Sequence, residues 1–258
     1  MLQAISYLAP NWFKFYQSVT DALSRSLSIN IRLRQGELDP LEDPWLLNDQ
    51  LDLAFICGLP FIRHHQAHAH QFQVLATPVM QAARYSDRPI YFSDVVVNAA
   101  SDIHQFSDLA RTKFGYNDLG SNSGYHLVRW HLLNQGYSDD FFGAWIATGS
   151  HQRSLQWVMD SRIDGTAIDS TVLEQALQDH PEWESGIRVI ATIGPSPMPP
   201  IIAANHLGAA IIDKLRSPLL HPDPDLQTAI AIAGVNRYQH LTWQDYLILA
   251  ERYSIATR

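Results

Sequence analysis

The stretch from Lys113 to Leu133 reads KFGYNDLGSNSGYHLVRWHLL, and it decides how the chain folds. Residues Lys113 to Asn117 predict a strand, and residues Tyr125 to Leu133 predict a helix. A turn and four small residues, Ser121-Asn122-Ser123-Gly124, separate the two. A strand that leads through a short turn into a helix is the building unit of an α/β fold.

Small polar residues at a helix start have two uses. They can cap the orphan N–H groups of the first turn, or they can hold an anion where those groups and the positive end of the helix dipole converge. A second helix start, Thr148-Gly149-Ser150-His151, carries the same kind of residues. Both follow a predicted strand, and ligands of open α/β sheets bind beyond the carboxyl ends of strands. The presence of two such helix starts favours an anion site. The alternative is that these residues only cap their helices.

Strands and helices alternate along the rest of the chain, which predicts an α/β fold with right-handed crossovers. The expected strands cover residues 2–8, 29–33, 51–57, 74–79, 91–97, 113–117, 145–148, 163–169, 188–193 and 200–204. The expected helices cover residues 13–27, 125–133, 152–159, 170–177, 207–215, 224–233 and 243–252, with short helical turns from 43 and 107.

The composition indicates a soluble globular chain. Of its 258 residues 46% are apolar and 17% charged, which argues against disorder. The net charge of −8 and the lack of a dense Lys/Arg run argue against nucleic acid or an anionic membrane as partner. The single cysteine, Cys57, excludes an internal disulfide. We expect no membrane insertion, because no apolar run reaches transmembrane length, and Met1 to Pro10 show no signal-peptide pattern.

Six short motifs carry a resemblance that covers most of the chain. They are Asp52–Pro60, Tyr91–Val97, Ser101-Asp102-Ile103 with Asp108-Leu109, Ser121–Gly124, Thr148–His151 and Gly165–Ser170. In this order and spacing they resemble the motifs of the phosphate-, phosphite- and phosphonate-binding proteins of ABC transporters. That family has the type 2 periplasmic-binding fold.

The resemblance implies two α/β lobes with a ligand cleft between them and closure of the lobes on binding. The first lobe would be residues 1–87 with 195–258, and the second 88–194. The strand at Tyr91 and the strand from Arg188 to Ile193 would be the hinges.

The resemblance also implies which residues bind the ligand. Hydroxyls and main-chain amides at one helix start would donate to the anion, and His151 would donate from the other. Tyr91 would offer its hydroxyl from the hinge, and the loop at Cys57-Gly58 would face the ligand from the first lobe. Asp169 would lie near the distal end of the ligand. The expected ligand-binding residues are Ser121, Asn122, Ser123, Gly124, His151, Tyr91, Cys57, Gly58 and Asp169.

Each of these residues has a plainer interpretation. His151 alone is more often a capping or core histidine, Tyr91 packs equally well in a half-buried hinge, and Cys57 fits an inert buried residue. The histidines from His64 to His70 invite a metal site, but no carboxylate or cysteine completes a ligand set nearby. We expect a solvated helix or loop there and no metal or other cofactor.

The leading hypothesis is therefore a solute-binding protein for ABC-type uptake of a small anion, with an ABC permease as its implied partner. Such a protein would act in the periplasm or at the cell surface. Aminoalkylphosphonate binders are expected to carry an acid where this chain has Pro199-Pro200, which leaves phosphate, phosphite, a small alkylphosphonate or a carboxylate. The alternative is a cytoplasmic enzyme or ligand sensor on the same fold, with His151 and Asp169 as base and orienting residue.

Overall fold

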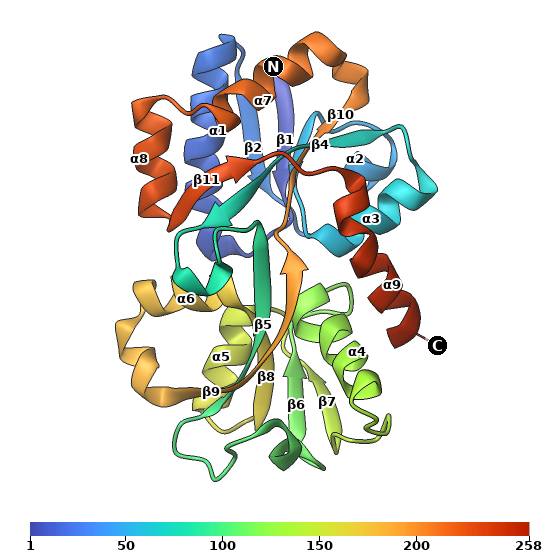
Figure 1. Ribbon diagram of the computed structural model, residues 1–258, viewed down its shortest axis with the longest axis vertical. Helices are drawn as coiled ribbons and strands as arrows, with labels where there is room; N and C mark the ends of the chain where they lie inside the picture. The colour runs from blue at the N-terminus through green and yellow to red at the C-terminus, as the bar shows by residue number, and fades with distance from the viewer. Residues whose placement is uncertain (258) are drawn as a thin grey trace. The chain divides into compact units, whose positions relative to one another are not determined.

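The computed structural model describes residues 1–257, and the chain divides into two compact units, each with its own β-sheet (Figure 1). Unit 1 contains residues 1–90 and 197–250. Unit 2 contains residues 91–196 and the described residues from Glu251 on. The division expected from the sequence placed the first two boundaries after residues 87 and 194 and had no third boundary.

Unit 1 has a six-stranded sheet in the order β11-β4-β10-β3-β1-β2. Strand β1 runs parallel to β2 and β3, whereas β10 is antiparallel to β3 and β4, and β11 is antiparallel to β4. The central strands β3 and β10 are buried along their whole length, as expected where both faces of a sheet are covered. The bounds are β1 Leu2–Ser6, β2 Ile31–Gln35, β3 Leu53–Phe55, β4 Phe72–Met80, β10 Ile201–Ala204 and β11 Val235–Gln239.

Amphipathic helices cover the unit 1 sheet. Helices α7 and α8 both contact α1, which lies beside α8 in Figure 1. Val19 and Leu23, one turn apart on α1, are fully buried. On α3, the ring of Phe61 packs edge-on against Tyr246, with ring centroids 5.3 Å apart. The bounds are α1 Phe13–Leu27, α2 Pro44–Leu47, α3 Gly58–Ala67, α7 Ala209–Leu220, α8 Pro224–Ile232, and the short helical turns η1 Pro10–Trp12, η2 Ala83–Tyr85, η6 Asn205–Leu207 and η7 Trp243–Tyr246.

Two elements of unit 1 went unassigned in the sequence analysis. Strand β11 alternates only weakly between apolar and polar residues, because it is an edge strand that pairs with β4 alone. Residues 64–70, expected as a solvated helix or loop, form the end of α3 and the turn after it; residues 66–70 are exposed, but the expectation was wrong for His64, which is buried.

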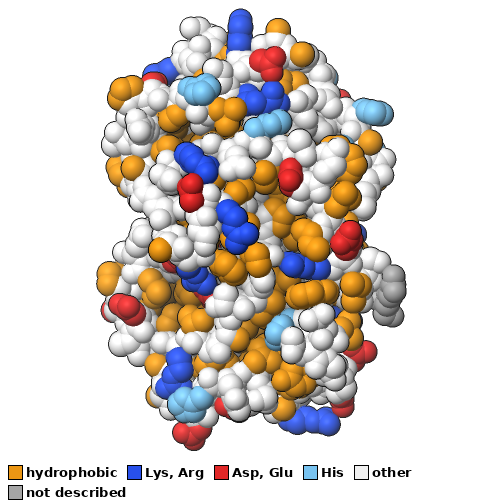
Figure 2. Space-filling view, viewed as in Figure 1, with side chains coloured by type: hydrophobic (Ala, Val, Ile, Leu, Met, Phe, Trp, Pro, Cys, Tyr) orange, Lys and Arg blue, Asp and Glu red, His pale blue; other side chains and the backbone are white. Residues whose placement is uncertain are grey.

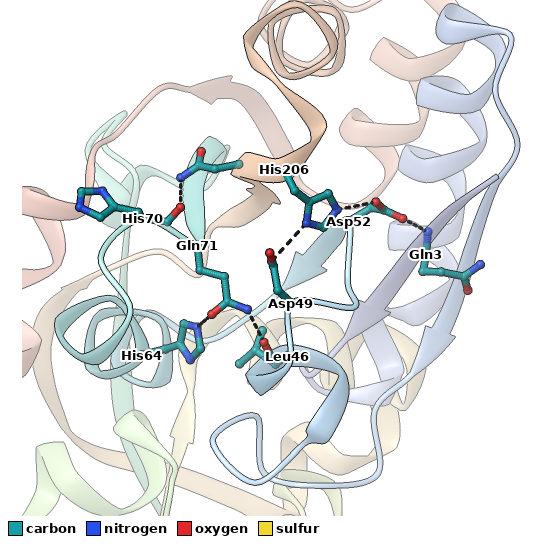
Figure 3. Close-up of polar contacts among 9 residues, drawn as sticks. Gln3, Leu46, Asp49, Asp52, His64, His70, Gln71 and His206 are labelled. Atoms are coloured by element: carbon teal, nitrogen blue, oxygen red, sulfur yellow. Dashed lines mark hydrogen bonds and ion pairs between the residues drawn. The ribbon is translucent and has the colours of Figure 1, made fainter.

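Polar contacts tie the loops at one end of unit 1 together (Figure 3). Nε2 of His64 lies 2.7 Å from Oε1 of Gln71. The ring of His206 bridges two carboxylates, with Nδ1 3.2 Å from Asp49 and Nε2 3.1 Å from Asp52. Burial lowers the pKa of His206, but the bonds to Asp52 and Asp49 outweigh it and leave this pKa raised. These histidines thus have structural partners in the loops, and residues 1–257 contain no group of three His, Cys, Asp or Glu placed to hold a metal.

Unit 2 has a five-stranded sheet in the order β7-β6-β8-β5-β9. Strand β6 is parallel to both β7 and β8, and β5 is antiparallel to β8. Its core combines aliphatic residues with Phe106, Phe114, Phe141 and Phe142, and the rings of Phe114 and Phe142 stack with centroids 4.2 Å apart. The bounds are β5 Ile90–Asn98, β6 Lys113–Tyr116, β7 Ala144–Ala147, β8 Gly165–Asp169, β9 Ile187–Pro197, α4 Leu127–Asn134, α5 His151–Met159, α6 Ser170–Asp179, and the short helical turns η3 Phe106–Leu109, η4 Asn122–His126 and η5 Pro181–Gly186.

The end of helix α9 (Leu247–Ala256) belongs to unit 2, although the sequence division placed it in the first lobe. The guanidinium of Arg252 lies 4.7 Å from the centre of the Trp130 ring. The ring of Tyr253 meets that of His126 edge-on, with centroids 4.7 Å apart. These contacts join positions more than 100 residues apart, so local sequence patterns do not reveal them.

Candidate anion-binding site

Three helical segments of unit 2 begin at the same edge of its sheet. Because β6, β7 and β8 are parallel, their carboxyl ends lie together, and η4, α5 and α6 start from there (Figure 1). The polar residues at 121–124 and 148–151 follow β6 and β7, and Asp169 is the last residue of β8. The sheet topology therefore brings the two helix starts singled out in the sequence to one edge.

The first of these helix starts, that of η4, keeps two main-chain N–H groups as donors. Ser121 is the N-cap, and its Oγ accepts a hydrogen bond from the Gly124 N–H at 3.1 Å. The turn is a π-turn, because the His126 N–H reaches back to the carbonyl of Ser121 at 3.1 Å. The N–H groups of Asn122 and Ser123 meet no acceptor among residues 1–257. Capping thus uses one amide and leaves two for a ligand.

The second helix start, that of α5, places His151 against the helix start at Ser123. Ser150 caps α5 through a bond from the Arg153 N–H at 3.2 Å, which leaves the N–H groups of His151 and Gln152 without an acceptor in the described chain. Nε2 of His151 lies 3.3 Å from Oγ of Ser123. Nδ1 of the same ring is buried and has no partner within residues 1–257.

Burial sets the charge of His151. The side chain is 8% exposed, and burial lowers its pKa to about 4, so the ring is neutral at pH 7. A buried polar nitrogen without a partner is rare in a folded protein, and a ligand atom is one way to satisfy it. An anion beside the ring would favour the imidazolium and raise this pKa.

Tyr91 and Asn122 hold each other in place. Nδ2 of Asn122 donates to the Tyr91 hydroxyl at 2.7 Å and to Oγ of Ser196 at 3.3 Å. Tyr91 is only 1% exposed. Oγ of Ser93 donates to the Ser123 carbonyl at 2.7 Å, which fixes the same turn from β5. The side-chain nitrogen of Asn122 is therefore engaged within unit 2, and its main-chain N–H is the donor left for a ligand.

Asp169 caps the third helix. Its Oδ1 accepts bonds from the N–H and the hydroxyl of Thr171, at 2.9 Å and 2.8 Å. Burial raises its pKa to about 6, against the hydrogen bonds from Thr171 that lower it, and the nearby Asp94 raises it further. The sheet register sets Asp169 opposite Ser93.

Of the other expected residues, Gly58 and Gly124 have packing roles that the structure makes explicit. Cys57 and Gly58 belong to unit 1, where Cys57 precedes α3 without a capping bond from its side chain. A Cβ on Gly58 would come within 2.8 Å of the Tyr246 ring, so this glycine permits close packing. A Cβ on Gly124 would lie 1.9 Å from Oδ1 of Asn117, so this glycine lets the Asn117 side chain pack closely against η4.

Comparison with known proteins decides the family. A family model described as "ABC transporter, phosphonate, periplasmic substrate-binding protein" matches residues 6–246. The chain belongs to this family. It is a family of substrate-binding transport proteins and not of enzymes, so the resemblance seen in the sequence is confirmed and the enzyme alternative is not favoured. No curated protein sequence matches the chain.

Solved structures show the same fold at low sequence identity. A binding-protein component of an ABC phosphonate transporter from Pseudomonas aeruginosa is 16% identical with a TM-score of 0.84, over 99% of this chain and 86% of that one. PhnD1 from Prochlorococcus marinus, in complex with methylphosphonate, is 17% identical with a TM-score of 0.85. The match covers 99% of this chain and 98% of that one. XAC2383 from Xanthomonas citri, bound to ATP, is 16% identical with a TM-score of 0.75. The match covers 100% of this chain and 97% of that one. The expected fold class, the periplasmic-binding type, is thus confirmed.

The surface of the chain mixes charged and apolar side chains (Figure 2). On the face drawn in Figure 2, Lys and Arg side chains are scattered among acidic and apolar ones. Through residue 257, no helix has the length and apolarity to cross a bilayer.

Sequence reasoning missed three residues around the candidate site. Ser93 and Ser196 orient the turn at 122–123, and Arg252 bonds to Ser196. Ser196 lies in the proline-rich stretch that separates two predicted strands, and Arg252 lies on the last helix. Neither position carries a local motif, because their roles depend on contacts with residues 56 and 74 positions away.

Proposed function

We propose that this chain binds a small phosphorus oxyanion at the edge of the unit 2 sheet where η4 and α5 begin. The observation that carries the proposal is His151, whose buried Nδ1 has no partner among residues 1–257 and whose Nε2 contacts Ser123. The unpaired N–H groups of Asn122 and Ser123 start the helical turn that holds the Ser123 hydroxyl.

The donors of this site are all neutral. They are main-chain N–H groups at two helix starts, one hydroxyl and one neutral imidazole. Hydrogen bonds from such groups to an anion are charge-assisted, and the two helix dipoles add to them. Donors from two helix starts suit a tetrahedral group with three oxygens better than a planar carboxylate. The local donors can hold an anion although the chain carries a net charge of −8.

The relatives support this class of ligand. PhnD1 is in complex with methylphosphonate, and XAC2383 is bound to ATP, which also carries phosphorus oxyanions. Pro199-Pro200 offers no acid for an ammonium group, which favours phosphite, phosphate or a small alkylphosphonate over an aminoalkylphosphonate. The closure of two lobes on the ligand stays a prediction.

The family description supports two further parts of the proposal. A substrate-binding protein of an ABC transporter delivers its ligand to a permease, so we propose an ABC permease as partner. The family is periplasmic, and we propose that this chain acts in that compartment.

Thermal denaturation in phosphate-free buffer tests the ligand class. We expect methylphosphonate, phosphite or phosphate at millimolar concentration to raise the melting temperature, because a ligand at 100 times its Kd stabilises by about 2.7 kcal/mol. Equal concentrations of 2-aminoethylphosphonate should raise it less, and sodium chloride at matched ionic strength is the control. The proposal fails if none of the three anions shifts the transition beyond this control.

A further inference from the structure

Arg252 is linked to the candidate site through two hydrogen-bonded side chains. Its Nη1 donates to the Pro195 carbonyl at 2.9 Å and to Oγ of Ser196 at 3.4 Å. The same Ser196 oxygen accepts from Nδ2 of Asn122 at 3.3 Å. Asn122 in turn presents one of the two unpaired N–H groups of η4. The guanidinium is therefore connected to the turn at which we place the oxyanion.

No carboxylate of residues 1–257 forms a direct ion pair with Arg252. The Nε of Arg252 is buried without a hydrogen-bond partner in the described chain. The Trp130 ring covers the guanidinium. Burial lowers the pKa of Arg252, and the nearby Tyr91 and Glu251 offset this only in part. A partly desolvated cation without a direct ion-pair partner costs folding free energy, unless an anion arrives to pair with it.

We propose that Arg252 is a positioning residue that supplies the positive charge for the bound oxyanion, acting through Ser196 and Asn122. This inference rests on the proposed function, since it needs an anion at η4. The neutral donors fix the geometry of the oxyanion, and Arg252 adds electrostatic attraction and holds the Asn122 amide in place. In a chain of net charge −8, such a local cation offsets the repulsion that an incoming anion meets.

A structural role alone would have different consequences. Arg252 also fastens the end of α9 to unit 2 through Trp130 and the Pro195 carbonyl. Loss of that anchor would lower the melting temperature of the ligand-free protein without changing how binding responds to salt. Loss of a charge that attracts the ligand makes the dependence of Kd on salt shallower.

Titration calorimetry with methylphosphonate at several sodium chloride concentrations separates the two roles. The variants are Arg252→Gln, Arg252→Lys and, as matched control, Arg129→Gln. Arg129 lies on α4 of the same unit, where it donates to the Tyr125 hydroxyl at 3.3 Å, and among residues 1–257 it bonds to neither Ser196 nor Asn122, so its replacement removes an equal charge that does not act through those two side chains. The melting temperature of each ligand-free variant is measured alongside.

We expect Arg252→Gln to weaken binding about tenfold and to flatten the salt dependence. Two unit charges about 10 Å apart at an effective dielectric constant of about 20 interact with roughly this strength. Arg252→Lys should stay within about threefold of the wild type, and Arg129→Gln within about twofold. The inference on Arg252 would be overturned if Arg252→Gln bound methylphosphonate with wild-type affinity. It would also be overturned if Arg252→Gln and Arg252→Lys lost equal affinity and the salt dependence of Kd stayed unchanged. Neither result would affect the proposed function. A wild type that binds no oxyanion would overturn the proposed function and this inference with it.

Discussion

Replacement of Ser123 by Ala together with His151 by Leu is expected to weaken methylphosphonate binding at least about a hundredfold. Each substitution removes a neutral donor from the site, and hydrogen bonds to a charged group contribute about 1.5–3 kcal/mol each. Two such losses amount to a hundredfold or more in Kd. Calorimetric titration of the double variant and of each single variant measures the effect.

The same double variant should fold as well as the wild type in the absence of ligand. Leu is close to His in volume, and it removes a buried nitrogen that has no partner in the described chain. His131→Leu is the matched control, because His131 is also partly buried in unit 2 but packs against Phe106. Binding by the double variant within about threefold of the wild type would contradict the placement of the ligand.

Asp169→Asn is expected to stabilise the protein at pH 8 and to leave its stability nearly unchanged at pH 4. The pKa of Asp169 is raised from 3.8 to about 6 in the folded state, chiefly by burial. Ionisation therefore disfavours folding, and the penalty appears as the pH rises from about 4 through 6. A rise of this size corresponds to about 3 kcal/mol above pH 6, which is an upper value. Asn keeps an oxygen that can cap α6, so the helix start is retained.

Denaturant unfolding at the two pH values checks this prediction. Asp223→Asn is the control, because Asp223 is an exposed N-cap on α8 that accepts from the Leu226 N–H at 2.7 Å. The control should change stability little at either pH. A loss of stability in Asp169→Asn at pH 8 would show that the carboxylate is favoured in the folded protein, contrary to its raised pKa.

The sequence predicted those features of the site that depend on local chain geometry. The strand before Asn117 and the helix after Ser123 follow from the pattern of apolar residues, and β6 and α4 lie where this pattern places them. The polar helix starts also follow from local preferences, and the parallel strands bring Ser123 and His151 within 3.3 Å of each other.

The features that were not predicted depend on contacts between distant positions. Asn122 looks like a ligand donor in the sequence, but its side-chain nitrogen is bonded to Tyr91 and Ser196. Gly58 looks like part of a ligand loop, and the nearby Tyr246 gives it a packing role that no local pattern shows. Arg252 carries no motif, since its position matters only once α9 reaches unit 2. The expected ligand roles of Tyr91, Cys57, Gly58 and Asp169 stay predictions.

Nuclear magnetic resonance titration of the ¹⁵N-labelled protein with methylphosphonate tests the central claim most directly. We predict the largest shift changes at the amides of Asn122, Ser123, His151 and Gln152, together with a rise in the pKa of the His151 ring above its value of about 4. Saturable changes confined to other residues, with these four amides and the His151 ring unaffected, would contradict the account.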